Sequence, residues 1–245
     1  MKWISEITGG LNMYPENLNG GVLITLGNSV ALPDEIKAQL LEKWEMANED
    51  GEVDDLIAEA EKIAAPKAYV IPATIDELEE DHVTLSDIRF ESTLMPQQLR
   101  PLYEKGGNPT IFAYTMTCGQ ELHKWFLSQT DFLLQGVAED ITIRYLGLVG
   151  GAMRDYVTNT CLPGKHFSSM NPGSLPSWNI KGQAPLFQLL GEGAARCGVE
   201  LTDSMLMVPF KSGSGVYYES EHNFESCMFC DKLTCPNRRA AFVGA

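Results

Sequence analysis

Hydrophobic and polar positions along the chain predict strands and helices that do not alternate strictly. Short apolar runs predict strands at residues 22–26, 68–71, 82–85, 88–90 and 110–116. The last run is continuous, which is typical of a strand buried on both faces. Apolar residues at helical spacing predict helices at about residues 34–47, 53–65, 96–103, 120–127 and 184–197. This mixed order favours an α+β fold with an antiparallel sheet over a parallel, doubly wound sheet.

The longest predicted helix covers about residues 132–159. Six apolar residues recur there at steps of three or four and form one stripe: Val137, Ile141, Tyr145, Leu148, Ala152 and Tyr156. Gly147, Gly150 and Gly151 lie inside the same helix, where each costs about 1 kcal/mol relative to Ala. Close packing of another element is the simplest explanation for these glycines, and a ligand near the backbone is the alternative.

A second glycine-rich segment lies between two strand candidates, residues 205–208 and 216–218. It consists of Lys211, Ser212, Gly213, Ser214 and Gly215. This spacing predicts a hairpin with its turn over residues 211–215. Because Gly-rich turns expose backbone N–H groups, the same segment is a candidate anion-binding site.

Composition and charge narrow the class of protein. The chain has 245 residues, of which 44% are hydrophobic, so it can form one large domain or two small ones. Its 18 Lys and Arg residues against 33 Asp and Glu residues give a formal charge of −15. Nucleic acid is therefore an unfavourable partner, whereas a basic protein surface, a metal or a cationic cofactor suits this charge. The acidic run at residues 76–81 is expected to be a solvated turn.

The hydropathy pattern predicts no membrane partner, because no apolar run approaches the roughly 20 residues that cross a bilayer. The first residues lack the apolar region of a secretory signal. We therefore expect a cytoplasmic protein, in which closely spaced cysteines are more often metal ligands or redox groups than disulfides.

Three cysteines near the C-terminus follow the spacing C-x2-C-x4-C: Cys227, Cys230 and Cys235. Two thiolates in this spacing can bind one ion, and the third adds a corner of a zinc site or of an iron–sulfur cluster. The spacing does not separate zinc from iron–sulfur. A redox dithiol and three unrelated cysteines are the alternatives.

Three thiolates leave one coordination position to be filled. Cys161, in a loop-like segment, is the first candidate, and His222 lies near the motif in the sequence. Cys118 and Cys197 are further candidates, although their apolar surroundings predict buried thiols without a metal. An exogenous ligand is the last option.

Several common catalytic motifs are absent from the sequence. It has no dinucleotide-binding or P-loop glycine motif, no nucleophile elbow and no H-E-x-x-H pair. His82, His123 and His166 are isolated, and we expect them at the surface or at helix ends rather than as catalytic bases.

Residues 198–215 read G-V-E-L-T-D-S-M-L-M-V-P-F-K-S-G-S-G. They resemble the G-x-x-L-T-E-S-x-x-M-x-P-x-x-S-x-S-G stretch in the activation domain of cobalamin-dependent methionine synthase. The N-P-G-S run at 171–174 and residues 184–190 are similar to the P-G-Y segment of that domain and its following helix. The T-C-G-Q-E-L run at 117–122 and the C-x2-C-x4-C-x-x-R tail resemble short stand-alone relatives.

The resemblance implies an α+β, methionine synthase activation-domain-like fold with a central antiparallel sheet flanked by helices. It divides the chain into a mainly helical N-terminal extension, residues 1–65, and an activation-domain-like domain with a cysteine-rich tail, residues 66–245. It also implies a set of cofactor-binding residues: Asn171, Pro172, Gly173, Ser174, Lys211, Ser212, Gly213, Ser214 and Gly215.

In the synthase, this domain binds S-adenosylmethionine and presents it to oxidised cobalamin, and reduction coupled to methyl transfer restores methylcobalamin. The resemblance therefore implies an accessory protein of a corrinoid-dependent methyltransferase system. It would act on cobalamin carried by a corrinoid protein or a corrinoid methyltransferase. The alternatives are an S-adenosylmethionine-using methyltransferase-type enzyme and a non-catalytic module that binds a corrinoid protein.

The sequence departs from the synthase pattern R-x-x-P-G-Y. Ser169 stands at the Arg position and Ser174 at the Tyr position. A guanidinium can hold a carboxylate with two hydrogen bonds, and serine cannot. This departure argues against S-adenosylmethionine as a cofactor of this chain.

Overall fold

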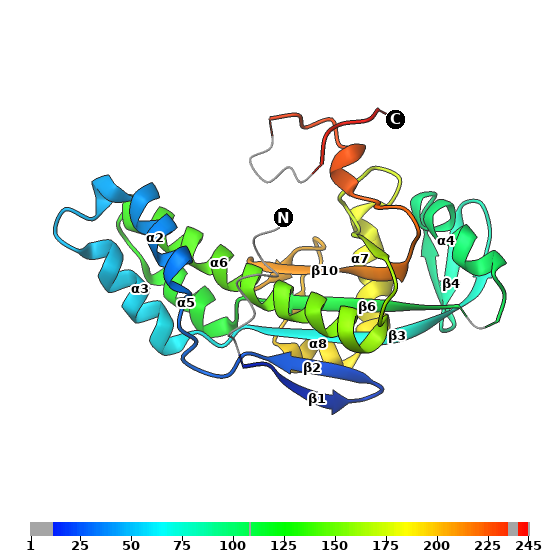
Figure 1. Ribbon diagram of the computed structural model, residues 1–245, viewed down its shortest axis with the longest axis horizontal. Helices are drawn as coiled ribbons and strands as arrows, with labels where there is room; N and C mark the ends of the chain where they lie inside the picture. The colour runs from blue at the N-terminus through cyan, green and yellow to red at the C-terminus, as the bar shows by residue number, and fades with distance from the viewer. Residues whose placement is uncertain (1–11, 108, 235–239, 245) are drawn as a thin grey trace.

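A computed structural model describes residues 12–107, 109–234 and 240–244. Its main sheet is antiparallel and has the strand order β1-β2-β3-β6-β10-β7 (Figure 1). These strands are β1 (Tyr14–Leu18), β2 (Gly21–Thr25), β3 (Lys67–Leu78), β6 (Thr110–Thr117), β10 (Ser212–Glu219) and β7 (Phe167–Met170). β4 (His82–Leu85) and β5 (Ile88–Glu91) extend the far end of β3, and β8 (Glu200–Leu201) pairs separately with β9 (Met207–Val208). The predicted α+β fold with a central antiparallel sheet is confirmed.

Helices cover both faces of this sheet and enclose two separate cores. One core contains side chains of α2 (Asp34–Lys43), α3 (Glu52–Ile63), α5 (Gln120–Ser128) and α6 (Phe132–Tyr156). The other contains side chains of α4 (Leu94–Glu104), α7 (Gln183–Leu190) and α8 (Glu192–Cys197). Figure 1 shows α2, α3, α5 and the start of α6 at one end of the molecule, and α4 with β4 at the other. The described helices include none that is long and apolar enough to cross a membrane.

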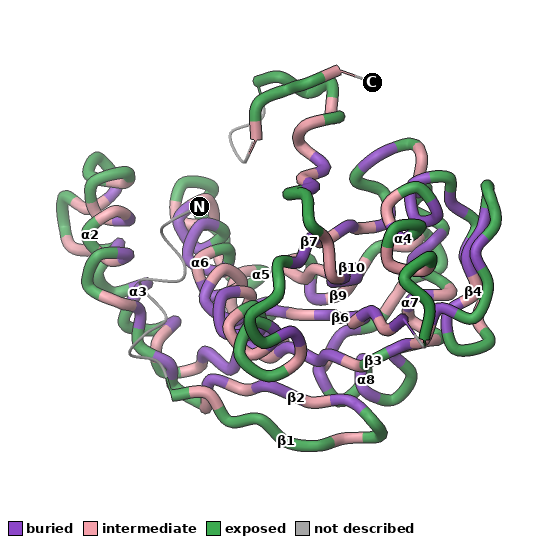
Figure 2. The backbone as a smooth tube through the Cα atoms, turned by 45° about the vertical axis from the view of Figure 1, so that its right-hand side comes forward, coloured by how far each residue is buried: buried purple, intermediate pink, exposed green. Residues whose placement is uncertain are grey.

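Burial is concentrated in the middle strands, whereas β1 at the sheet edge is mostly exposed (Figure 2). β6 shows the alternation that two cores require, because Ile111 and Ala113 belong to one core and Tyr114 to the other. The prediction that this strand is buried on both faces is confirmed.

The long helix α6 also agrees with its prediction. Asp131 caps its N-terminus, because the Asp131 carboxylate accepts hydrogen bonds from the backbone N–H groups of Leu133 and Leu134 at 2.8 and 3.0 Å. Five residues of the predicted stripe are buried, and Tyr156 is half-buried. A π-helical turn, Val157–Cys161, follows the helix.

The predicted hairpin over residues 211–215 is wrong. β9 pairs with β8, while β10 starts at Ser212 and lies between β6 and β7. The Ser and Gly residues that suggested a turn are therefore the first half of a central strand. A strand tolerates glycine where another group approaches the backbone closely, which is the case here.

Two element boundaries also differ from prediction. β3 continues through the acidic run to Leu78, with an irregularity in its pairing to β4 between Ile75 and Glu77, so only residues 79–81 connect the two strands. Ile75 and Leu78 are buried while the acidic residues between them face solvent. The helix predicted at 184–197 is two helices, because Gly191 interrupts it with a φ of 53°.

Elements on both sides of residue 65 contribute to one sheet. Val22 of β2 lies opposite Val70 of β3, and helices α2 and α3 pack in the same core as α6. Residues 1–11 lie outside the described part of the chain. The division into an extension and a domain stays a prediction.

Candidate functional site

The structure brings the two predicted cofactor-binding segments together on neighbouring strands. Met170 of β7 lies opposite Val216 of β10, which places Asn171 beside Gly215. A Cβ atom added at Gly215 would lie 2.5 Å from the Met170 carbonyl oxygen and 3.0 Å from the Tyr114 hydroxyl. It would also overlap the Asn171 amide. Glycine at 215 is therefore required by the approach of Asn171.

A row of polar side chains holds this junction. The Asn171 Nδ2 donates to the Tyr114 hydroxyl at 2.8 Å and to the Ser214 carbonyl oxygen. The Ser214 Oγ in turn donates to the Gln183 Oε1 of α7 at 2.8 Å. Ser214 and Gln183 are each 3% exposed. Because an amide has two N–H donors, Asn171 uses both within the protein and has only its carbonyl oxygen left for a ligand.

Met116 of β6 fills the space between Gly150 of α6 and Gly213 of β10. Its Sδ lies 3.1 Å from a Cβ built at Gly150, and its Cε lies 2.8 Å from one built at Gly213. Gly147 is different, since an added Cβ there meets nothing within 4 Å. Close packing thus explains Gly150, as the sequence indicated, but leaves Gly147 facing open space.

Lys211 lies directly before β10 and forms an ion pair with α6. The Lys211 Nζ lies 2.6 Å from Glu139 Oε1 of α6, and the Lys211 carbonyl oxygen accepts from the Cys118 backbone N–H at 3.0 Å. Ser212 is paired with Thr117 in the sheet, and its Oγ is buried with no hydrogen-bond partner in the described part of the chain. Binding of a cofactor by residues 211–215 stays a prediction.

An aromatic row that sequence reasoning missed leads from this junction to the surface. The rings of Tyr114 and Tyr217 stack at 4.5 Å, and Phe167 meets Tyr217 edge to face at 5.4 Å. The Arg154 guanidinium lies 4.8 Å above the Phe167 ring. Ser169 follows Phe167 by two residues on β7 and shares its side of the strand. A guanidinium therefore approaches this side of β7 from α6, although the strand position itself is serine.

Ser174 does not join the junction at Asn171. Pro172 is buried, and Gly173 has a φ of 80° with its backbone N–H bonded to the Trp178 carbonyl oxygen at 2.8 Å. This turn directs the chain away from β10, and Ser174 lines a separate cavity beside α4. The predicted set is thus split between two places.

The cysteine-rich tail lies next to that cavity. Cys227 belongs to a short helical turn, Ser226–Met228, and Cys230 follows it; both are half-buried, and Cys235 lies outside the described residues. Cys230 packs against the α4-side core, while Cys161 packs against the α6-side core. The described residues contain no group of three or more His, Cys, Asp or Glu side chains that could hold a metal. The metal centre and its fourth ligand stay predictions.

The remaining cysteines differ in burial and acidity. Cys118 and Cys197 are each 1% exposed, as their apolar surroundings indicated. Burial raises the pKa of both thiols to about 12 and that of Cys161 to about 11. A metal at any of them would have to displace a firmly held proton. His222 is exposed, and its carbonyl oxygen accepts from the Ser168 Oγ at 2.9 Å.

Two of the isolated histidines are buried, which corrects the expectation of surface positions. His82 is 7% exposed, with its Nδ1 2.8 Å from Asp81 Oδ1. His123 is 8% exposed and meets Phe210 edge to face at 5.1 Å, and burial lowers the pKa of its imidazole. Both rings fill space in the fold, which a lone histidine in a sequence does not reveal.

We compared the sequence and the structure with known proteins. No protein-family model matches the sequence, and no curated protein matches it significantly. Among solved structures, the chain is similar to the crystal structure of the MetH reactivation domain bound to AdoHcy, with a TM-score of 0.54 and 17% identity. The match covers 78% of this chain and 68% of that chain. The chain therefore has an α+β fold that matches that of the MetH reactivation domain.

Proposed function

We propose that the chain is an accessory protein of a corrinoid-dependent methyltransferase system. It assists reductive reactivation or methyl transfer at cobalamin carried by a corrinoid protein or corrinoid methyltransferase. The observation that carries the proposal is the junction of β7 and β10. Two segments far apart in the sequence, each resembling an activation-domain motif, meet there at Asn171 and Gly215. The fold match to the MetH reactivation domain supports the same reading.

We place the contact with the partner on the exposed side of α6. Glu139, Ile143, Gly147 and Arg154 recur along this side at helical spacing, and Ile143 is 42% exposed. Gly147 leaves open space, so another molecule can approach the backbone there. The Lys211–Glu139 ion pair lies at one end of this side and Arg154 at the other.

Sedimentation velocity tests the docking. A corrinoid protein from the same organism is followed by its corrinoid absorbance, alone and with the chain. We expect the wild-type chain to shift the boundary and Gly147→Trp to prevent the shift, because a bulky side chain would fill the open space. Ala195→Trp is the matched control, since Ala195 is exposed on α8 at the opposite sheet face. An unshifted wild-type boundary would contradict the proposal.

We further propose that Cys227, Cys230 and Cys235 hold an iron–sulfur cluster or zinc. The support is their spacing, together with the position of Cys227 on a short helical turn and of Cys230 directly after it. A cluster would supply electron transfer, and zinc would fix the tail. Anaerobic metal and sulfide analysis with an absorption spectrum separates the two. We expect Cys230→Ser to lose the metal, and a wild-type protein without metal would exclude both.

An S-adenosylmethionine-using enzyme is the second candidate, favoured by a neighbour that is described as bound to AdoHcy. The β7 segment fits this ligand poorly, because position 169 is serine and both N–H groups of Asn171 are engaged. Only Arg154 brings a guanidinium near Phe167 among the described residues. Calorimetry with millimolar S-adenosylmethionine tests this candidate. Saturable binding heat that is lost in the Arg154→Met variant would support it, and the absence of binding heat would exclude it.

A further inference from the structure

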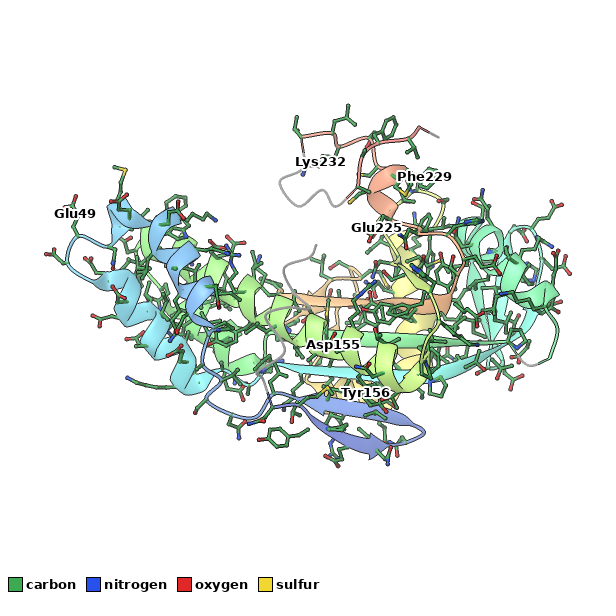
Figure 3. The ribbon with its side chains drawn as sticks, in the orientation of Figure 1. Glu49, Asp155, Tyr156, Glu225, Phe229 and Lys232 are labelled. Atoms are coloured by element: carbon green, nitrogen blue, oxygen red, sulfur yellow. The ribbon has the colours of Figure 1, made fainter. Side chains whose placement is uncertain are left out.

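A second cavity lies outside the β7–β10 junction, between α4, the loop at residues 174–177 and the C-terminal tail. Its volume is about 540 Å³, within the range of small-molecule sites. Figure 3 shows Phe229 on the tail segment that forms one wall. The opposite wall is α4, which contributes Gln97. Its lining includes Cys230, which is also a proposed metal ligand, but none of the functions proposed above places a small molecule in this cavity.

Three phenyl rings dominate the tail side of the cavity. Phe224 is 7% exposed and anchors the tail in the α4-side core. Phe229 stacks on it with ring centres 5.7 Å apart and an interplanar angle of 19°. Phe242 comes from the end of the chain, which the Val243 backbone N–H fastens to the Met228 carbonyl oxygen at 2.9 Å. The tail thus gathers three aromatic rings from separate positions around one space.

The charge at this cavity is negative. Among the described residues that line it, Asp231 is the charged one, and it is accompanied by neutral groups such as Gln97 and Ser174. The whole chain carries a formal charge of −15. A cation is therefore attracted by the field of the protein, by the carboxylate and by the phenyl rings that line the cavity.

From this combination we infer that the cavity binds a methylated ammonium compound. A quaternary ammonium donates no hydrogen bonds, so phenyl walls can replace its water shell without leaving a donor unsatisfied. A primary ammonium gains no hydrogen bond from the phenyl walls, so its N–H groups would depend on polar lining residues such as Gln97 and Asp231. The volume exceeds that of a trimethylammonium head group, which leaves room for an uncharged substituent such as a hydroxyethyl chain. The inference is independent of the cobalamin-linked function.

A ligand-observed NMR titration with choline and its neutral isostere 3,3-dimethylbutan-1-ol tests this site. The two probes share shape and apolar surface, so their affinities differ through the charge. We expect choline to bind at least about tenfold more tightly than the alcohol. Equal affinities would show a merely apolar cavity and overturn the inference, and so would the absence of saturable choline binding.

Variants locate the site. Phe229→Leu and Asp231→Asn are each expected to weaken choline binding by about three- to tenfold, while Asp231→Asn leaves binding of the alcohol unchanged. Phe210→Leu is the matched control, because Phe210 is 57% exposed and contacts His123 elsewhere. Phe229 and Asp231 are on the surface, so the variants are expected to fold, which circular dichroism checks. Unchanged choline affinity in both tail variants would overturn the assignment.

Discussion

At the scale of single residues, the most constrained position is Gly215. The Asn171 amide and the Met170 carbonyl oxygen occupy the space where a side chain would start. Their position depends on strand pairing between segments more than 40 residues apart, since the Asn171–Ser214 bond spans 43 residues. The sequence shows a Gly-Ser-Gly run but cannot show what lies beside it. For this reason a central strand was predicted as a turn.

Gly215→Ala is expected to destabilise the protein by about 1–3 kcal/mol, because the added methyl group overlaps well-packed neighbours. Urea unfolding followed by circular dichroism measures the change. Gly147→Ala is the matched control and is expected to be neutral or to stabilise by up to about 1 kcal/mol, since the methyl group meets open space on a helix. Equal stabilities of the two variants would contradict the packing described at the junction.

Cys118 and Cys197 are expected to resist alkylation in the folded protein. With a pKa of about 12, only about one thiol in ten thousand is ionised at pH 8, and the thiolate is the reactive form. Mass spectrometry after iodoacetamide treatment should find both cysteines unlabelled in buffer. It should find both labelled in about 6 M guanidinium, which unfolds most domains. Labelling in buffer at the rate of a small-molecule thiol would show that these cysteines are not buried.

At the scale of elements, the features that depend on local spacing could be predicted. The α6 stripe, the burial of β6 and the α5 and α4 helices follow from periodicity and are confirmed. The ends of elements that depend on pairing or packing with other elements could not be predicted. β3 runs on through an acidic segment because β4 pairs with it and the irregularity between Ile75 and Glu77 keeps the carboxylates outside. The break at Gly191 likewise separates α7, which contacts β5, from α8, which contacts β2.

The N-terminus of α6 offers a test of local capping. Asp131→Ala removes the acceptor for two backbone N–H groups and should cost about 1 kcal/mol of unfolding free energy. Asp131→Asn keeps a capping side chain and should cost much less. Urea unfolding of the three proteins ranks them, and an alanine variant as stable as the wild type would show that the cap contributes nothing.

The contribution of Glu219, at the end of β10, to the stability of the protein should depend on pH. Hydrogen bonding to Lys165 and then Lys105 lowers the pKa of the Glu219 carboxyl below its usual 4.5. A lowered folded-state pKa gives stability that is present above pH 4.5 and is lost as the pH falls through the folded value. Wild type should therefore exceed Glu219→Gln in stability at pH 6, and the difference should shrink at pH 3. A difference that does not change between these pH values would contradict the interaction.

At the scale of the whole molecule, one sheet separates two cores, and the two proposed sites lie on different sides of it. The proposed docking side of α6 belongs to one side of the sheet, while the tail cavity lies beside α4 on the other. The fold class could be predicted from the mixture of strands and helices. The roles of Arg154, Gln183 and the aromatic row could not be predicted, because they arise from contacts between distant elements. Tyr114 lies opposite Gly215 and Tyr217 opposite Phe112, so the two rings are diagonal neighbours, a register that a single sequence does not reveal.

The central claim is that the chain restores cobalamin held by another protein. The most direct test follows the absorbance of cob(II)alamin on a corrinoid protein, with a one-electron reductant and a methyl donor, in the presence and absence of the chain. The proposal predicts that the chain speeds the loss of cob(II)alamin, that Gly147→Trp does so less, and that Ala195→Trp does so as well as the wild type. The same rate with and without the wild-type chain would contradict it.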